Sequence, residues 1–375
     1  MPRRRPSPVP EVAADVLEPR RLLSAVTLRA GDGADRTVTL EAGVTDLTLR
    51  GGRRDGAFGA TTIVASATDR LTVRTSHGAR LADLTVLPGN DLRLRGVTAD
   101  SLNVTDAGAA DVWVVRADAG VLSVAGGGGE GAGRLRVAKS AVAGDAAADF
   151  GPGGADVAVN RTTVGGDLAL TAAGDARFLV RDADVGGAAS VVTGAGRDAV
   201  RVLDSSAGAL SVATGARADR VTLKRTAAAA ADLAGGNGGD VLRVFGGDFA
   251  DGLTVEADGG ADDVRVRNAA ADVLGVAGGG GADRVRLAGV AAESVVADLG
   301  AGGDVLALGD AGAVADLLFE GDPGDFAGDR LRAAGDAAEG LLDDARAALR
   351  DALGDLGDDL EDLADDARDF FDRLF

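Results

Sequence analysis

Pairs of apolar residues separated by one residue recur along most of the chain. The first member of each pair returns every 20 to 23 residues, and the second lies two residues later. Alternation with a period of two is typical of a strand that buries one face. The first members are Leu71, Leu92, Val112, Leu135, Val157, Phe178, Val200, Val221, Leu242, Val264, Val285 and Leu306. The spacing therefore predicts about twelve copies of one structural unit.

A second apolar pair follows about ten residues after the first in many repeats, as at Leu168/Leu170 and Leu210/Val212. Between the two pairs lies another apolar position, such as Val164. Each repeat thus has two strands and a third, shorter segment that faces inward. We expect residues 27–332 to form an all-β, right-handed parallel β-helix of about twelve coils of about 21 residues. A leucine-rich repeat has a similar period, but its LxxLxLxxN pattern is missing.

The two ends break this pattern. Residues 1–26 begin with a run rich in arginine and proline, and we expect this tail to be disordered. In residues 333–375 apolar residues recur every seven positions, which predicts an acidic amphipathic helix or a helix pair. Residues 336–375 hold 14 Asp or Glu and 4 Arg, and Gly354 and Gly357 indicate a bend. This segment would cap the last coil or pair with a second copy as a coiled coil.

Composition restricts the classes of partner. The net charge is −20, which argues against nucleic acid and other polyanions, because binding them needs basic surface. The chain has no cysteine, so disulfides and thiolate metal sites are excluded. No apolar run approaches the roughly 18 residues that a membrane span needs, so we expect no membrane insertion.

The turn before each first strand carries the sharpest chemical pattern, a glycine-rich run followed by aspartate. Two turns, at Gly235–Arg243 and Gly278–Arg286, resemble the GGxGxDxUx nonapeptide of RTX calcium-binding repeats, although the period here is about 21 rather than nine. Stacked coils would place like charges about 5 Å apart, so something must compensate them. The carboxylates in question are Asp198, Asp219, Asp240, Asp262, Asp283 and Asp304.

Two interpretations of this aspartate ladder are open. Calcium would use the carboxylates and turn carbonyls as hard oxygen ligands, although the fold requires no cofactor. Alternatively, each aspartate caps backbone N–H groups while Arg201, Arg220, Arg265 and Arg284 neutralise the charge.

No catalytic constellation stands out. The chain has no GxxxxGK[ST] phosphate loop, and His77 is its only histidine. Many parallel β-helices cleave or bind polysaccharide, but aromatic residues make up only 3% of this chain, so stacking surfaces for sugar rings are scarce. Trp113 lies between two core positions and should face outward as a candidate contact.

A short N-terminal segment, Val16 to Val26, resembles the LEPRxLL motif of a family of large, repetitive, extracellular bacterial proteins. The resemblance implies sorting or export; the alternative is a short amphipathic lead-in that caps the first coil. The matching residues are Leu17, Glu18, Pro19, Arg20, Leu22 and Leu23.

These observations favour a non-enzymatic extracellular or cell-surface module, structural or adhesive, that contacts a surface or matrix component. Self-association through the C-terminal segment is a further expectation. Two alternatives remain: a polysaccharide lyase or hydrolase that uses surface carboxylates, and a calcium-stabilised RTX-like module.

Overall fold

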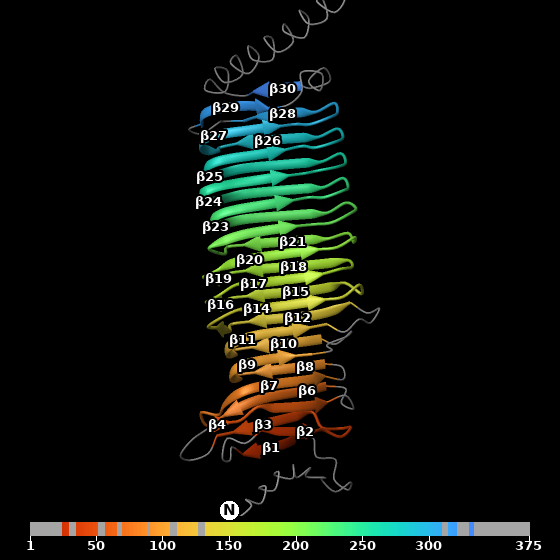
Figure 1. The fold of residues 1–375 in the computed structure, drawn as a ribbon, viewed down its shortest axis with the longest axis vertical. Coiled ribbons are helices and arrows are strands. Elements are labelled where there is room, and N and C mark those ends of the chain that lie inside the picture. Colours follow the sequence, from red (N-terminus) through yellow and green to blue (C-terminus); the bar gives the residue numbers. More distant parts are fainter. Residues whose placement is uncertain are drawn as a thin grey trace, which may run out of the picture.

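The fold is a β-solenoid. The computed structural model describes residues 25–29, 35–51, 57–65, 70–88, 91–105, 111–126, 132–309, 314–320 and 330–333. The chain winds through about twelve turns, stacked along the long axis of the molecule (Figure 1). All of the strand pairs between neighbouring turns are parallel, and the described residues contain no helix. The expected all-β parallel solenoid is confirmed.

Each turn has three sides, which we number by the length of their runs of paired strands and not by their order along the chain. Side 1 ends at a corner that leads to the short side 3, and side 2 leads through the glycine-rich turn back to side 1. The strands of side 1 are β1 (Ala25–Arg29), β3 (Asp46–Arg50), β6 (Arg70–Ser76), β8 (Asp91–Arg95), β10 (Asp111–Val115), β12 (Gly133–Ala138), β15 (Ala155–Asn160), β18 (Ala176–Arg181), β21 (Ala199–Leu203), β26 (Arg284–Ala288), β28 (Val305–Leu308) and β30 (Arg330–Ala333), together with the first residues of β23 (Arg220–Ala234), β24 (Val241–Glu256) and β25 (Asp263–Ala277).

Side 3 has the shortest strands, and side 2 shares the long strands β23 to β25 with side 1. Side 2 contains β2 (Arg36–Thr39), β5 (Thr61–Ala65), β7 (Arg80–Pro88), β9 (Thr98–Val104), β11 (Asp118–Ala125), β14 (Ala146–Phe150), β17 (Leu168–Ala172), β20 (Ala188–Thr193), β22 (Ala209–Ala213), β27 (Ala291–Asp298), β29 (Val314–Glu320) and the last residues of β23 to β25. Side 3 contains the two-residue strands β4 (Ala57–Phe58), β13 (Ala141–Val142), β16 (Thr163–Val164) and β19 (Asp184–Val185).

The core is a narrow column of aliphatic side chains inside the coils. All twelve first members of the apolar pairs point into it, and each is at most 1% exposed. They stack in register, as when Phe178 pairs with Val157 on one side and Val200 on the other. Burial of every second residue over twelve strands supplies the hydrophobic free energy that holds the rod together.

The coil at β14 leaves a small cavity in the core. Ala146 and Ala148 stand where neighbouring coils place Leu168 and Leu170, with which they pair. A small cavity of about 10 Å³ lies beside them, lined also by Leu122 and other aliphatic residues. Alanine is too short to fill the space that leucine fills in the next coil.

Two expected segments lie outside the described residues: the LEPRxLL segment with its six matching residues, and the acidic C-terminal segment. The predicted disordered tail over residues 1–26 and the predicted helical segment over residues 333–375 stay predictions for the same reason. Within the described residues, no helix is long and apolar enough to cross a membrane.

Candidate functional site

The six ladder aspartates lie at the corner between side 2 and side 1. Each one comes directly before or at the start of a side 1 strand, as Asp240 does before β24. Single β-bridges hold the glycine-rich turns of successive coils in register, as between Asn237 and Gly259. The turns therefore stack, and the aspartates form one continuous row along the rod.

The ladder carboxylates are buried rather than exposed on an edge. All six residues are at most 3% exposed. In each case Oδ1 accepts a hydrogen bond from the backbone N–H at the same position of the preceding coil: the N–H of Asp219 donates to Asp240 at 2.7 Å, and that of Asp262 to Asp283 at 2.8 Å. Each aspartate thus caps an N–H group that would otherwise be buried without a partner.

Burial also changes the acidity of the ladder. Desolvation raises the pKa of Asp219 and of Asp283 to about 6, and that of Asp240 to about 7, because a charged carboxylate is poorly solvated there. Neighbouring ladder carboxylates raise the pKa of Asp240 further. The backbone N–H that each one accepts acts in the opposite direction. Each ladder carboxyl that is protonated removes its share of the repulsion between the stacked charges, and the raised pKa values make this protonation easier.

The expected arginine compensation lies elsewhere. Arg201, Arg220 and Arg284 are exposed on side 1, whereas the ladder is buried at the corner. Arg265 donates to Asp263, at 2.6 Å from Nη2, and not to a ladder residue. The geometry provides these carboxylates with a hydrogen bond from a backbone N–H of the preceding coil rather than with an ion pair to these arginines.

Calcium would need six to eight oxygen ligands converging on one point. The second carboxylate oxygens of five ladder residues, Asp198 to Asp283, are buried without a hydrogen-bond partner among the described residues. However, in that part of the chain no group of three acidic or histidine side chains converges on a metal-sized site. The turn carbonyls are engaged between coils, as when Gly236 O accepts the N–H of Gly259. The hydrogen bonds to Oδ1 therefore favour the capping interpretation, and calcium binding stays a prediction.

We therefore expect millimolar calcium to leave the melting temperature unchanged, because the capping geometry offers no complete ligand set. Calorimetric titration and a thermal melt with and without chelator would measure this. A melting temperature that rises with calcium, together with binding heat lost in Asp240→Asn, would instead establish the RTX-like interpretation.

The outward surface of side 1 is strongly basic. Between residues 132 and 309 its outward positions carry 12 Arg or Lys and two Asp. The rest of the exterior of the same region carries five Arg or Lys and 15 Asp or Glu, apart from the six buried ladder aspartates. The cations are Arg134, Arg136, Arg177, Arg181, Arg201, Arg220, Lys224, Arg243, Arg265, Arg267, Arg284 and Arg286. We call this surface the basic face.

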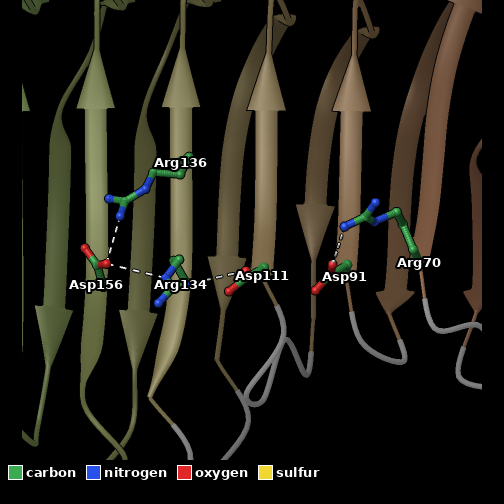
Figure 2. A network of polar contacts seen from close by, with 6 residues as sticks. All are labelled: Arg70, Asp91, Asp111, Arg134, Arg136 and Asp156. Atoms are coloured by element: carbon green, nitrogen blue, oxygen red, sulfur yellow. Dashed lines mark hydrogen bonds and ion pairs between the residues drawn. The ribbon is translucent and has the colours of Figure 1, made fainter.

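The two carboxylates of the basic face, Asp156 and Asp263, are paired with arginines. Arg134 lies between Asp111 and Asp156, at 3.2 and 3.4 Å, and Arg136 contacts Asp156 at 2.8 Å (Figure 2). Nearer the C-terminal end, Asp263 contacts Arg265 and Arg286. Such half-exposed pairs add little stability individually. From β18 to the first residues of β24 the outward positions carry cations and no carboxylate, although Arg181 contacts Asp182 at the adjacent corner at 3.6 Å.

Trp113 lies on the same face, 36% exposed, as the alternation predicted. Its neighbours in register are Arg93 and Arg136, and the Arg93 guanidinium stacks 5.4 Å from the ring centroid. An aromatic ring between cations is a suitable contact for a sugar ring that carries negative charge.

The separate signals for this face were present in the sequence, since Arg243, Arg265 and Arg286 occupy the polar positions between core residues. The net charge of the chain did not indicate a basic face, because it is the sum over all sides of the rod. Comparison with protein-family models, with curated proteins and with solved structures finds no match, so the site is interpreted from its geometry alone.

Proposed function

We propose that this chain is a non-enzymatic structural and adhesive module of the cell surface or extracellular matrix, which binds an anionic matrix polysaccharide through the basic face. The observation that carries the proposal is the segregation of charge: cations collect on side 1 of a molecule whose net charge is −20. A regular row of arginines on a straight sheet complements a linear polymer that repeats its own negative charge.

Several further features belong to this proposal. The LEPRxLL resemblance supports an extracellular location, and the stacked coils, expected to be right-handed, supply a stiff support. The amphipathic pattern after residue 333 supports a C-terminal helical segment whose apolar stripe covers the last coil. The acidic exterior of the other sides favours a polysaccharide over nucleic acid, whose wide duplex would approach those sides as well.

Neutralising the centre of the basic face should weaken binding. The double variant Arg201→Gln with Arg243→Gln is expected to bind immobilised alginate roughly three- to tenfold more weakly, because the charge contacts of an exposed and a half-buried arginine are lost. Binding of the parent chain should fall steeply as salt rises, since counterions compete for the face. Surface plasmon resonance at several salt concentrations measures both effects.

The matched control is Arg197→Gln with Arg217→Gln, which removes the same charge from exposed arginines outside side 1. This variant should bind alginate as the parent does. Equal loss in both variants, equal binding to neutral dextran, or stronger binding to duplex DNA would each contradict the proposed partner.

A further inference from the structure

The centre of the basic face is a staggered lattice of cations. On β18, β21 and the first residues of β23 and β24, six outward positions are Arg or Lys and none is acidic. The register alternates them: Arg201 pairs with Leu179 and Thr222, and Arg243 pairs with Thr222. The six are Arg177, Arg181, Arg201, Arg220, Lys224 and Arg243.

Partly exposed apolar side chains occupy the positions between these cations. Leu179, Leu203 and Phe245 point outward from side 1 and are neither buried nor fully exposed. Directly opposite like charges would destabilise the sheet, and the alternation avoids them between β18 and β24, whereas on the next strand Arg265 lies directly opposite Arg243. The result is a surface that offers apolar contact and positive charge at neighbouring points, which suits an amphipathic acidic segment better than a purely polar one.

The chain carries such a segment. Residues 358–375, DDLEDLADDARDFFDRLF, hold eight Asp or Glu and two Arg. The apolar residues Leu360, Leu363, Ala367 and Phe370 recur at helical spacing, and an acidic residue directly precedes each of them. Gly354 and Gly357 come directly before, where the sequence pattern predicts a bend.

The segment is also within reach. β30 pairs with β28 on side 1, so the chain leaves the described solenoid from the sheet that carries the basic face. From β30 to β24 there are four strand steps, through β28, β26 and β25. At about 4.8 Å per step this is about 20 Å. Residues 334–357 provide 24 residues to cover it, more than enough even in a helix, and leave length for a cap over the last coil.

We propose that residues 358–375 bind the basic face of their own molecule over β18, β21, β23 and β24. The acidic side chains pair with the staggered cations, and the apolar stripe lies along Leu179, Leu203 and Phe245. Tethering makes the local concentration of the segment high, so individually weak contacts suffice. The inference uses the basic face but does not depend on the adhesive function, and a polymer that binds there must displace the segment.

The absence of cysteine makes a distance measurement direct. Spin labels are attached to the full chain at Thr222→Cys, in the middle of the lattice, and at Ala364→Cys. The control pair combines Ala364→Cys with Ser211→Cys, which is exposed on side 2. Pulsed electron resonance is recorded at 20 mM and 1 M salt, with a tenfold excess of unlabelled chain.

The expected result is a short, narrow distance for the Thr222 pair at low salt. It lengthens and broadens at 1 M salt, where the Debye length is only about 3 Å, and also when Arg201→Gln and Arg243→Gln are added. The Ser211 pair should be longer than the Thr222 pair at low salt, because Ser211 lies on side 2, and it should broaden when the segment is released. A Thr222 distance that ignores both changes would overturn the proposal. A short distance that disappears on dilution with unlabelled chain would assign the contact to a second copy instead. Neither result requires a polysaccharide, so failure here leaves the adhesive proposal intact.

Discussion

Replacing Gly260 with alanine is expected to lower the free energy of unfolding by more than about 3 kcal/mol, or to prevent the surrounding coils from folding. Gly260 has a φ of 142°, which L side chains rarely adopt. A Cβ there would lie 1.4 Å from the carbonyl oxygen of Gly238 in the preceding coil. That contact is with backbone held by coil-to-coil hydrogen bonds, such as the one from Gly238 N–H to Gly259 O at 2.6 Å. Relief would require neighbouring coils to separate.

The glycine-rich turn of the next coil supplies a matched control. A Cβ added at Gly280 meets nothing within 4 Å, and Gly280 has no positive φ. Gly280→Ala should therefore change stability by less than about 1 kcal/mol. The neighbouring Gly281→Ala should behave like Gly260→Ala, since its Cβ would lie 1.6 Å from Gly260 O. Urea and thermal unfolding followed by circular dichroism measure all three. Similar midpoints for Gly260→Ala and Gly280→Ala would contradict the close stacking of these turns.

The aspartate ladder is expected to make the protein less stable as pH rises from about 4 to about 8. The folded-state pKa values of Asp219, Asp240 and Asp283 are about 6, about 7 and about 6. An unfolded aspartate titrates near 3.9, so the folded state binds more protons across this interval. The stabilising contribution is therefore fully present below about pH 4 and is lost as pH rises through the folded-state pKa values. Each unit of pKa difference corresponds to about 1.4 kcal/mol, an upper limit for coupled groups.

Asparagine and alanine separate the two roles of the ladder. Asp240→Asn keeps an oxygen that can accept the N–H of Asp219 but removes the charge, so it should be more stable than the parent at pH 8 and show a weaker pH dependence. Asp240→Ala leaves that N–H without its acceptor and should cost about 1 to 3 kcal/mol, even at pH 4. Unfolding midpoints at pH 4, 6 and 8 give both results.

Asp232 provides the control, because it is an exposed aspartate of β23 outside the ladder. Asp232→Asn changes the net charge by the same amount, so it measures the effect of general repulsion in an acidic protein. If Asp232→Asn altered the pH dependence as much as Asp240→Asn did, burial of the ladder would not be its cause.

The sequence could predict the coils because their determinants are local and repeated. The alternation at positions such as Val264 and Val266 specifies a half-buried strand. Because it returns about every 21 residues, each coil can pair in register with the next, which favours a stacked parallel solenoid. Even the weak coil was visible, since Ala146 and Ala148 are shorter than the residues with which they stack. For segments without this period, such as residues 334–375, the expected helical structure remains a prediction.

The role of the aspartates could not be read in the same way. The Gly–Asp turns resemble a calcium motif locally, but whether Asp240 faces solvent, a metal or a backbone N–H depends on the coil above and below it. Stacking buries the carboxylate and supplies an N–H donor, and the pKa follows from that environment. A local motif carries neither piece of information.

The sequence by itself determined the strand alternation and the approximate number of coils, because each depends on residues close together in the chain or on a constant period. Only the tertiary structure decided that the aspartates are buried caps, and that a chain with a net charge of −20 presents a basic face. The reason is that winding brings residues about 21 positions apart side by side and sends alternate side chains to opposite surfaces. Charges that cancel in the composition are thereby separated in space.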